Sequence, residues 1–598
     1  MGESMAKRKR GLRRLILVAL IVVLTGSAGV AWVGTRALSS RDHLQQAATL
    51  VSQLRRQLQE VDPAAAQTLA RLQQETRSAR ADANDPVWRS GTRLPLVGDD
   101  LAAVRTVTVA LDRLAQDGLP QLVATAGMLN AGSLMPTNGR IDPMPLKRAA
   151  PKLAEAAAAV RQARDSVGAI ATGGLTEPVR AAVTRLRDDL RSASRTAEVA
   201  ANSAALLPAM LGANGPRTYL VLLQNLAEVR ATGGMPGAFI VVRADRGKVT
   251  IVDQGTASGL EPFAEPVLAL TSADRRLYTG KLATFPADVN FTPHFPTTGA
   301  LAREMYRRRS GVTVDGVLST DPVALSYLLK ALGPVPVPGG EPLTAGNAVP
   351  FLLSRIYAGD LSPEQQDGYF AAAARATFQA LLSRPLNPSA LLDSLARAAG
   401  ERRLLVWSAH AEENSLLENT VLAGALPVSD GPNPTVGVFL NDGSGAKLGY
   451  YLTHSAMLAV TPICRSDGRR EITLRVTLGS TAPESGLSSY VLGLGLAGDP
   501  YTIRTNVSVY SPTGGTIVGM RLDRGEQSFT SGRDRRRAVG IVTVDLKPGT
   551  KRTLDVTMLT GVPAGGYGPK VTPRLWTTPG VVPWSRLTES GDGCPISR

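Results

Sequence analysis

A dense group of polar residues lies between two apolar runs in the segment "YLVLLQNLAEVRATGGMPGAFIVV". An arginine in this group could bind a phosphate or a carboxylate through two parallel N–H groups. The glycines could bring backbone N–H groups close to the same anion, and the glutamate could pair with the arginine or hold a metal ion. This pattern predicts a ligand-binding site whose candidates are Gln224, Asn225, Glu228, Arg230, Thr232, Gly233 and Gly234.

The same segment also has a purely structural interpretation. Gln224 and Asn225 could cap backbone groups at the end of a strand, and Glu228 and Arg230 could neutralise each other. The residue pattern leaves both interpretations open.

Further polar candidates lie at boundaries between predicted helices and strands, where α/β proteins tend to place ligands. Each of them is also an ordinary capping or turn residue. They are Asn290, Asp315, Asp321, Arg355, Asp360 and Gln365.

Common catalytic and cofactor motifs are missing from the sequence. It contains no G-x-x-x-x-G-K-[ST], no H-E-x-x-H and no G-x-S-x-G pattern, and no G-x-G-x-x-G follows a strand-like run. The histidines His43, His294, His410 and His454 show no metal-ligand spacing. The cofactor therefore stays unknown at this level.

The elements that must position these residues indicate several domains, as expected for 598 residues. Residues 36–212 show leucine and valine at helical spacing and predict a stalk or bundle of helices. Residues 213–425 alternate strand-like and helix-like runs, which predicts an α/β layered domain. Residues 430–598 contain short alternating strands separated by turns, which predicts a β-sandwich.

Two local signals within the α/β region are specific. Asp245-Arg246-Gly247 is a plausible hairpin turn between two strands. Ser362 is a good N-cap, and Pro363 would occupy the first position of the helix that follows.

The N-terminus combines a basic tail with an apolar run. Six Lys or Arg residues lie within residues 1–14, and an uncharged run from Leu15 to Gly34 follows, with Trp32 near its end. At ~1.5 Å per residue this run could cross a hydrocarbon core of ~30 Å. It predicts a transmembrane helix over 15–34, a cytoplasmic tail over 1–14 and an extracytoplasmic remainder, so the membrane is an expected partner. The alternative is a cleaved signal peptide.

Composition and cysteines add to this picture. Hydrophobic and charged contents of 43% and 19% fit a globular chain, and the net charge of +16 is partly concentrated in the N-terminal tail. Nucleic acid is therefore not an expected partner. Cys464 and Cys594 would both be exported, and an even count in an oxidising compartment predicts a disulfide, the alternative being two free thiols.

Several segments resemble the domain-of-unknown-function 4012 family. They include "LLQNLAEVRATGGMPGAF", "VDGVLSTDPVALSYLLKALGPV" and "VGVFLNDGSGAKLGYYL". The resemblance extends over about residues 95–560 and implies a single-pass, exported envelope protein of a bacterium, here an actinobacterium. The activity of that family is not established.

The order of motifs from residue 218 to 382 is also similar to the LytR-CpsA-Psr domain. That family transfers glycopolymers from polyprenyl-pyrophosphate lipids and uses arginines for the diphosphate and an aspartate for Mg²⁺. Here Pro236-Gly237 replaces its first aspartate, Asp253-Gln254-Gly255 replaces its Pro-Arg-Asp turn, and no arginine flanks Gln365-Gln366. The resemblance thus implies a shared fold with lost or altered chemistry.

Three functional hypotheses follow. The first is a membrane-anchored envelope protein that binds an envelope glycopolymer, a lipid-linked precursor or a partner protein. The second is a phosphotransferase that uses Arg230, Glu228, Asp253 and Asp360 around a divalent ion such as Mg²⁺. The third is a structural spacer in which the helical stalk is the important part.

Overall fold

The fold is known from a computed structural model, which describes residues 31–592 except 59, 61, 96, 127–134, 138, 360, 385, 419, 432, 563–566, 568 and 569. The side chains of residues 363, 364, 367, 463 and 464 are not described. The chain divides into two compact units. Unit 1 comprises Met1–Leu134 and Asp142–Ala209, and unit 2 comprises Met135–Ile141 and Met210–Arg598.

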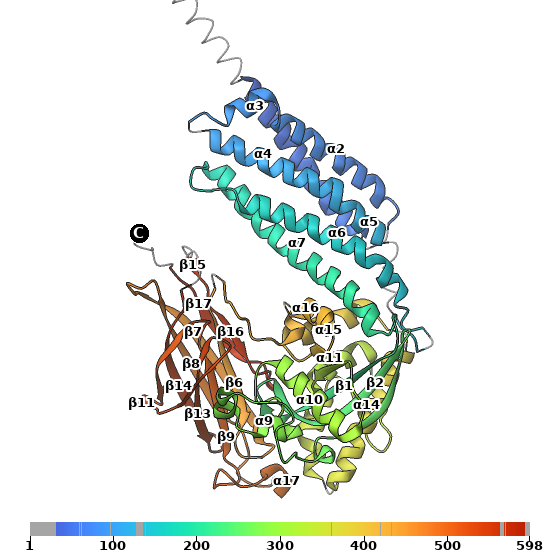
Figure 1. Cartoon of the computed structure of the whole chain (residues 1–598), viewed down its shortest axis with the longest axis vertical. Helices are drawn as coiled ribbons and strands as arrows, with labels where there is room; N and C mark the ends of the chain where they lie inside the picture. The colour runs from blue at the N-terminus through green and yellow to red at the C-terminus, as the bar shows by residue number, and fades with distance from the viewer. Residues whose placement is uncertain are drawn as a thin grey trace, which may run out of the picture. The chain divides into compact units, whose positions relative to one another are not determined.

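The described part of unit 1 is helical throughout (Figure 1). Residues 31–58 form a helix, and a π-helical turn, η1, spans Leu114–Gly118. The other helices are α2 (Ala65–Ala83), α3 (Pro86–Gly91), α4 (Gly98–Arg113), α5 (Leu119–Ala126), α6 (Met144–Gly168) and α7 (Glu177–Met210).

Alanine is prominent where the helices of unit 1 meet. Ala103 and Ala110 of α4 pack in one cluster with Ala163 of α6 and with Val183 and Leu190 of α7. Small side chains let helix axes approach closely, and the buried leucines and valines supply most of the apolar area. The alternating burial along these helices is the periodicity that the sequence showed.

The expected transmembrane helix is corrected by the structure. Within the described residues, no helix is long and apolar enough to cross a membrane. Most of the segment that begins at Leu15 lies outside the described residues, whereas Trp32 is described and is 46% exposed. The fold class of the described chain is mixed α/β with several sheets.

The first part of unit 2 is built on a five-stranded sheet with the order β3-β2-β1-β4-β5. Strand β1 pairs antiparallel with β2 and parallel with β4, and β5 pairs antiparallel with β4. The turn between β2 and β3 falls at Arg246 and Gly247, both with positive φ, as the sequence predicted. The strands are β1 (Arg217–Arg230), β2 (Gly233–Asp245), β3 (Lys248–Thr256), β4 (Gly316–Thr320) and β5 (Leu405–Ser408).

Helices cover both faces of this sheet, and the side chains of β1 alternate between them. Leu220 and Leu222 pack in a cluster with Leu301 and Met305 of α10 (Phe295–Ser310). That face also receives α8 (Ser272–Tyr278) and α9 (Lys281–Thr284). The 3₁₀ turn η4 (Pro286–Asp288) follows α9 and contacts β2.

The opposite face of the sheet carries Tyr219, Val221 and Leu223, which pack toward Ala374 and Phe378 of α14. The helical elements that cover this face of the sheet are α11 (Pro322–Leu332), the π turn η5 (Phe351–Arg355), α13 (Ile356–Ala358) and α14 (Pro363–Ser383). The remaining helices of this region before β5 are the short α12 (Ala348–Pro350) and the longer α15 (Pro388–Gly400).

Helix α14 begins as the sequence predicted. Ser362 is its N-cap, and its hydroxyl accepts the backbone N–H of Gln365. The Gln365 side chain returns a bond to the backbone N–H of Ser362, which completes a capping box.

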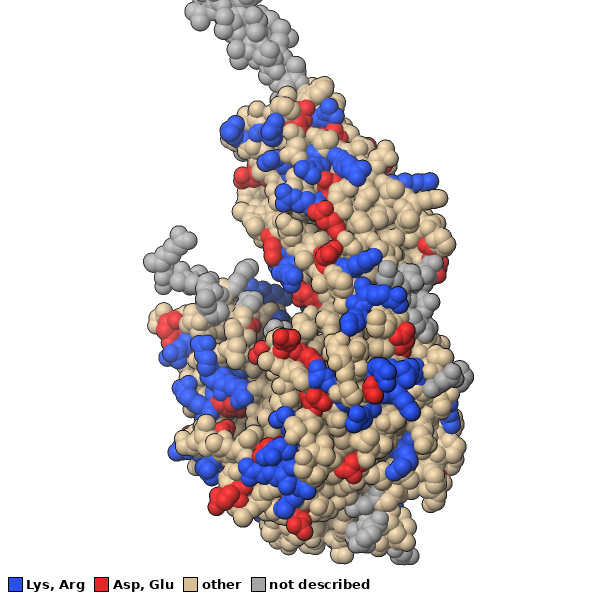
Figure 2. Space-filling view, turned by 45° about the vertical axis from the view of Figure 1, so that its right-hand side comes forward, with Lys and Arg blue, Asp and Glu red and all other residues tan. Residues whose placement is uncertain are grey.

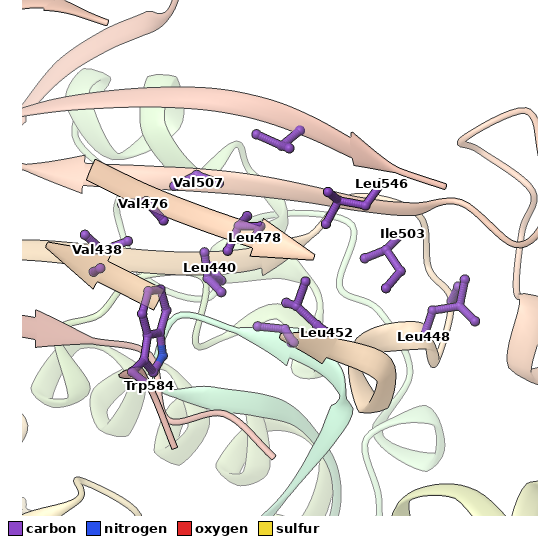
Figure 3. Close-up of a cluster of buried hydrophobic side chains, with 14 of the residues drawn as sticks. Val438, Leu440, Leu448, Leu452, Val476, Leu478, Ile503, Val507, Leu546 and Trp584 are labelled. Atoms are coloured by element: carbon purple, nitrogen blue, oxygen red, sulfur yellow. The ribbon is translucent and has the colours of Figure 1, made fainter. Parts of the chain in front are cut away.

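The second part of unit 2 contains two larger sheets. A six-stranded sheet has the order β11-β10-β14-β8-β7-β17, and a five-stranded sheet has the order β12-β13-β9-β6-β16. Val438 and Leu440 of β6 lie in one apolar cluster with Val476 and Leu478 of β8 (Figure 3), so the two sheets pack face to face. The strands of these two sheets are β6 (Thr435–Asp442), β7 (Leu452–Cys464), β8 (Arg470–Ser480), β9 (Ile503–Tyr510), β10 (Thr516–Leu522), β11 (Gly525–Glu526), β12 (Thr530–Asp534), β13 (Arg537–Leu546), β14 (Lys551–Leu559), β16 (Arg574–Thr577) and β17 (Ser585–Glu589).

The visible surface carries both signs of charge. On the face shown in Figure 2, Lys and Arg side chains are interspersed with Asp and Glu. A mixed surface of this kind is typical of side chains that face solvent.

Candidate functional site

The polar segment found in the sequence forms an irregular end of β1. The pairing of β1 with β2 shifts register between Leu223 and Gln224 and again between Asn225 and Val229, so residues 226–228 have no partner in β2. At this point the backbone of β2 approaches that of β1 closely, an arrangement we call the close crossing. It requires glycine at position 234, because a Cβ there would lie 2.2 Å from the carbonyl carbon and oxygen of Asn225.

Gln224, Thr232 and Asn290 form a buried hydrogen-bond network behind this crossing. The Gln224 amide donates to Thr232 Oγ1 at 3.0 Å and to Ser319 Oγ, and its oxygen accepts the N–H of Gly234 at 3.0 Å. Asn290 donates to Thr232 Oγ1 at 2.9 Å and to the Gly234 carbonyl at 2.8 Å. The backbone N–H expected to face an anion is therefore bonded to the protein's own glutamine.

Arg230 is buried and makes charge-assisted bonds to two carboxylates. Its Nη2 lies 2.8 Å from Glu228 Oε1 and 2.9 Å from Asp288 Oδ1, and its guanidinium lies 5.0 Å from the centre of the Phe291 ring. A second cation, Lys447, has its Nζ 3.6 Å from Glu228 Oε2. We call Glu228, Arg230, Asp288, Asp442 and Lys447 the buried ion cluster.

Burial and the neighbouring charges together set the pKa values of the three carboxyl groups in the buried ion cluster. Burial opposes ionisation of Glu228, but Arg230 and Lys447 outweigh burial and lower the pKa of Glu228. Burial raises the pKa of Asp288 despite its contact with Arg230. Burial, together with repulsion from Glu228, raises the pKa of Asp442 to about 6 although Arg230 opposes the shift. Three carboxylates thus share two cations, and Asp442 is the one whose ionisation is most opposed.

An apolar cavity of about 620 Å³ lies on the α14 face of the first sheet. Val221, Leu223 and Ile240 form its floor, and aliphatic and aromatic side chains from the helices form its remaining walls. The helical contributions include Leu325, Leu328 and Leu332 of α11, Leu352 and Leu353 of η5, and Phe370, Ala373, Ala374, Phe378 and Leu381 of α14.

One edge of the cavity is polar and adjoins the buried ion cluster. Asn225 donates to the hydroxyl of Tyr357 at 2.6 Å, and both residues line the cavity. Lys447 lines it as well, with its Nζ 4.6 Å from the centre of the Tyr490 ring. Thr377 of α14 also lines the cavity, and its buried hydroxyl lacks a hydrogen-bond partner within the described residues. The cavity therefore has a mainly apolar lining, with Asn225, Tyr357 and Lys447 forming a polar margin.

Comparison with known families tests the expected resemblance. Residues 214–357 match the model of the family described as "Protein of unknown function (DUF4012)". The DUF4012 resemblance is thereby confirmed over these residues. No curated protein and no solved structure gives a significant match to the chain.

The DUF4012 segment supplies only part of the site. It contains Glu228, Arg230 and Asp288, the floor of the cavity and Tyr357. Asp442, Lys447 and Tyr490 come from the β-sandwich part of unit 2, and α14 also follows the segment. The cavity is therefore completed by residues beyond the matched family region.

The other candidates from the sequence are dispersed. Asp321 caps α11 and pairs with Arg403 at 3.0 Å, both buried, at the cavity wall. Asp315 pairs with Arg217 at 3.1 Å, and Arg355 pairs with Glu341 at 2.7 Å on the surface. Two predictions fall outside the description: Asp360, and the disulfide, because Cys594 and the Cys464 side chain are not described.

The residues do not fit the magnesium site that the phosphotransferase hypothesis requires. Glu228 and Asp288 direct oxygens to Arg230, and Asp253 accepts the hydroxyl of Tyr306 at 2.6 Å. Among the described residues, no group of three or more His, Cys, Asp or Glu side chains is placed to hold a metal ion. The described carboxylates are thus engaged with other protein groups and do not form a magnesium site.

The sequence analysis missed Asp288, Asp442, Lys447 and Tyr357. Asp442 and Lys447 lie within "LNDGSGAKLGYYL", a stretch that the family resemblance had included without assigning a role to its residues. A polar residue between short strands looks like an ordinary turn residue, so no local signal distinguished them.

Proposed function

We propose that unit 2 binds the hydrocarbon chain of a lipid or a lipid-linked envelope precursor. The observation that carries this proposal is the 620 Å³ cavity between the first sheet and helices α11 and α14. Cavities of this size with mainly apolar walls and a few polar groups are typical ligand sites. An apolar interior gives water few hydrogen-bond partners, so an apolar chain is the favoured occupant.

The polar margin supports an amphiphilic ligand over a plain hydrocarbon. Asn225, Tyr357 and Lys447 would contact the head group where it joins the chain, while the aliphatic walls hold the chain itself. Chain burial supplies affinity at about 25 cal/mol per Å² of apolar area. The order of motifs that is similar to the LytR-CpsA-Psr domain, whose members use polyprenyl-pyrophosphate lipids, favours the lipid carrier of a glycopolymer as the ligand. A protein with that ligand would act at the cell envelope.

The experiment measures binding of a dansyl-labelled long-chain fatty acid to the full chain, followed by displacement with a polyprenyl phosphate. We expect saturable binding with a blue-shifted emission and competitive displacement. Ala374→Trp should weaken probe binding at least about tenfold, because the indole would occupy the cavity that Ala374 lines.

Gln379→Trp is the matched control, since Gln379 lies on the same helix but is exposed. It should bind the probe like the wild type. Equal binding by the wild type and by folded Ala374→Trp would refute the proposal.

A further inference from the structure

The loop between β8 and β9 presents leucines to solvent. Residues 485–498, "SGLSSYVLGLGLAG", contain no charged side chain. Leu494 is 74% exposed, the highest value among the large hydrophobic side chains of the described residues, and Leu496 is 58% exposed. Neither leucine lines the cavity. Exposed apolar side chains gathered in one loop are typical of an interaction surface.

The base of this loop is held firmly. Ser488 donates its hydroxyl to the carbonyl of Tyr357 at 2.9 Å, and the N–H of Lys447 donates to the carbonyl of Val491 at 2.8 Å. Arg504 of β9 donates to the carbonyl of Leu496. The leucines are therefore displayed from an anchored loop, which includes the short helix α17 (Ser489–Leu492) at the lower edge of unit 2 in Figure 1.

The same loop forms part of the cavity margin. Tyr490 lines the cavity, and its ring lies 5.7 Å from the ring of Tyr357. The exposed Leu494 and Leu496 thus follow the cavity margin by only a few residues along the chain. Tyr490 is thus the residue of this loop that lines the cavity.

We infer that the leucine loop, residues 485–498, docks on the surface of a lipid bilayer and lets the cavity exchange its ligand with that bilayer. This inference rests on the proposed function, because a ligand with a long hydrocarbon chain has a negligible free concentration in water and is held in membranes. Exposed leucines on an uncharged loop enter the boundary between head groups and acyl chains favourably. The loop would place the cavity margin at that boundary.

The first test reads the environment of the loop in the full chain. A coumarin amino acid that reports local polarity is placed at position 494, and in a separate protein at position 518 of β10, where Val518 is 60% exposed but lies outside both the cavity lining and the loop. Phosphatidylcholine vesicles should shift the emission at position 494 to the blue and leave position 518 unchanged. No shift at 494, or equal shifts at both positions, would overturn the inference.

The second test measures ligand transfer. The dansyl fatty acid is loaded into phosphatidylcholine vesicles, and its rate of transfer to the protein is recorded. L494S/L496S should slow transfer at least about tenfold and keep the wild-type affinity for the probe without vesicles, whereas V518S should transfer at the wild-type rate. Unchanged transfer by the double variant would overturn the inference.

Two further outcomes distinguish a failure of the membrane inference from a failure of the proposed function. If the wild type fails to bind the probe without vesicles, the proposed function fails and the loading role fails with it. If the probe binds but the coumarin at 494 responds to protein concentration and not to vesicles, the loop contacts a second copy of the chain, and only the membrane inference is overturned.

Discussion

Arg230 Nη2 lies 2.9 Å from Asp288 Oδ1, and both side chains are buried although 58 residues separate them in the chain. The contact joins the end of β1 to the 3₁₀ turn η4 that precedes α10. The arginine that looked like a ligand-binding residue in the sequence is thus committed to holding two parts of unit 2 together.

The first prediction concerns removal of this arginine. Arg230→Ala should lower the free energy of unfolding by about 3–5 kcal/mol, because Glu228 and Asp288 would remain buried without their main cation. Urea denaturation followed by circular dichroism measures the loss. Arg355→Ala is the matched control, since its pair with Glu341 is 53% and 41% exposed and should change the free energy by less than about 1 kcal/mol. Similar losses in the two variants would contradict a structural role for Arg230.

The sequence correctly predicted a turn and a helix cap, because both depend only on residues close together in the chain. The turn at Arg246 and Gly247 and the capping box of Ser362 and Gln365 depend on neighbouring residues only, and both are present. The partners of Arg230 depend on contacts between distant residues, so no pattern in the segment could reveal Asp288 or Lys447.

The cavity was hidden from the sequence for a related reason. Val221 and Leu223 alternate with Leu220 and Leu222 along β1, and both pairs look like ordinary core. Only the placement of α14 opposite Val221 and Leu223 leaves space on one face of the sheet. The predicted transmembrane helix was wrong for the described residues, in which no helix is long and apolar enough to cross a membrane.

The second prediction is a pH dependence from Asp442. Its pKa is raised from 3.8 to about 6 in the folded protein, so the folded state binds more protons than the unfolded state between these values. The contribution of Asp442 to the free energy of unfolding therefore falls as pH rises from about 4 to 6, by about 3 kcal/mol.

Asp442→Asn should remove that dependence while its side-chain oxygen still accepts the backbone N–H groups of Ser444 and Gly445. Urea denaturation of both proteins at a series of pH values gives the difference. The variant should gain stability relative to the wild type as pH rises through this range. A difference that stays constant with pH would show that the carboxyl of Asp442 does not titrate there.

The third prediction has the opposite sign and concerns His454. Its ring stacks on Trp584 with centroids 4.2 Å apart, and burial lowers its pKa from 6.5 to about 4. Because the unfolded state binds the proton more readily, the contribution of His454 to stability is lost as pH falls from about 6.5 to 4, by about 3 kcal/mol. His454→Phe keeps a stacked ring but has no titrating group. Its free energy of unfolding should therefore fall less than that of the wild type between pH 7 and pH 4. An equal or greater fall in the variant would refute this assignment.

The fourth prediction tests the close crossing that shapes the end of β1. Gly234→Ala would place a methyl group 2.2 Å from the backbone of Asn225, and a backbone obstacle cannot rotate away. We expect a loss of at least about 2 kcal/mol in the free energy of unfolding, together with weaker binding of the dansyl fatty acid, because Asn225 lines the cavity.

Gly237→Ala is the matched control on the same strand, β2. Its added methyl group would meet the Cε atom of Met235 at 3.4 Å, which is ordinary contact with the end of a flexible side chain. Its free energy of unfolding should stay within about 1 kcal/mol of the wild type, since a Gly-to-Ala change in a strand also favours the folded state. Equal stability and equal probe binding by the two alanine variants would contradict this prediction. The irregular end of β1, and the position of Asn225 in the cavity lining, would then not require glycine at position 234.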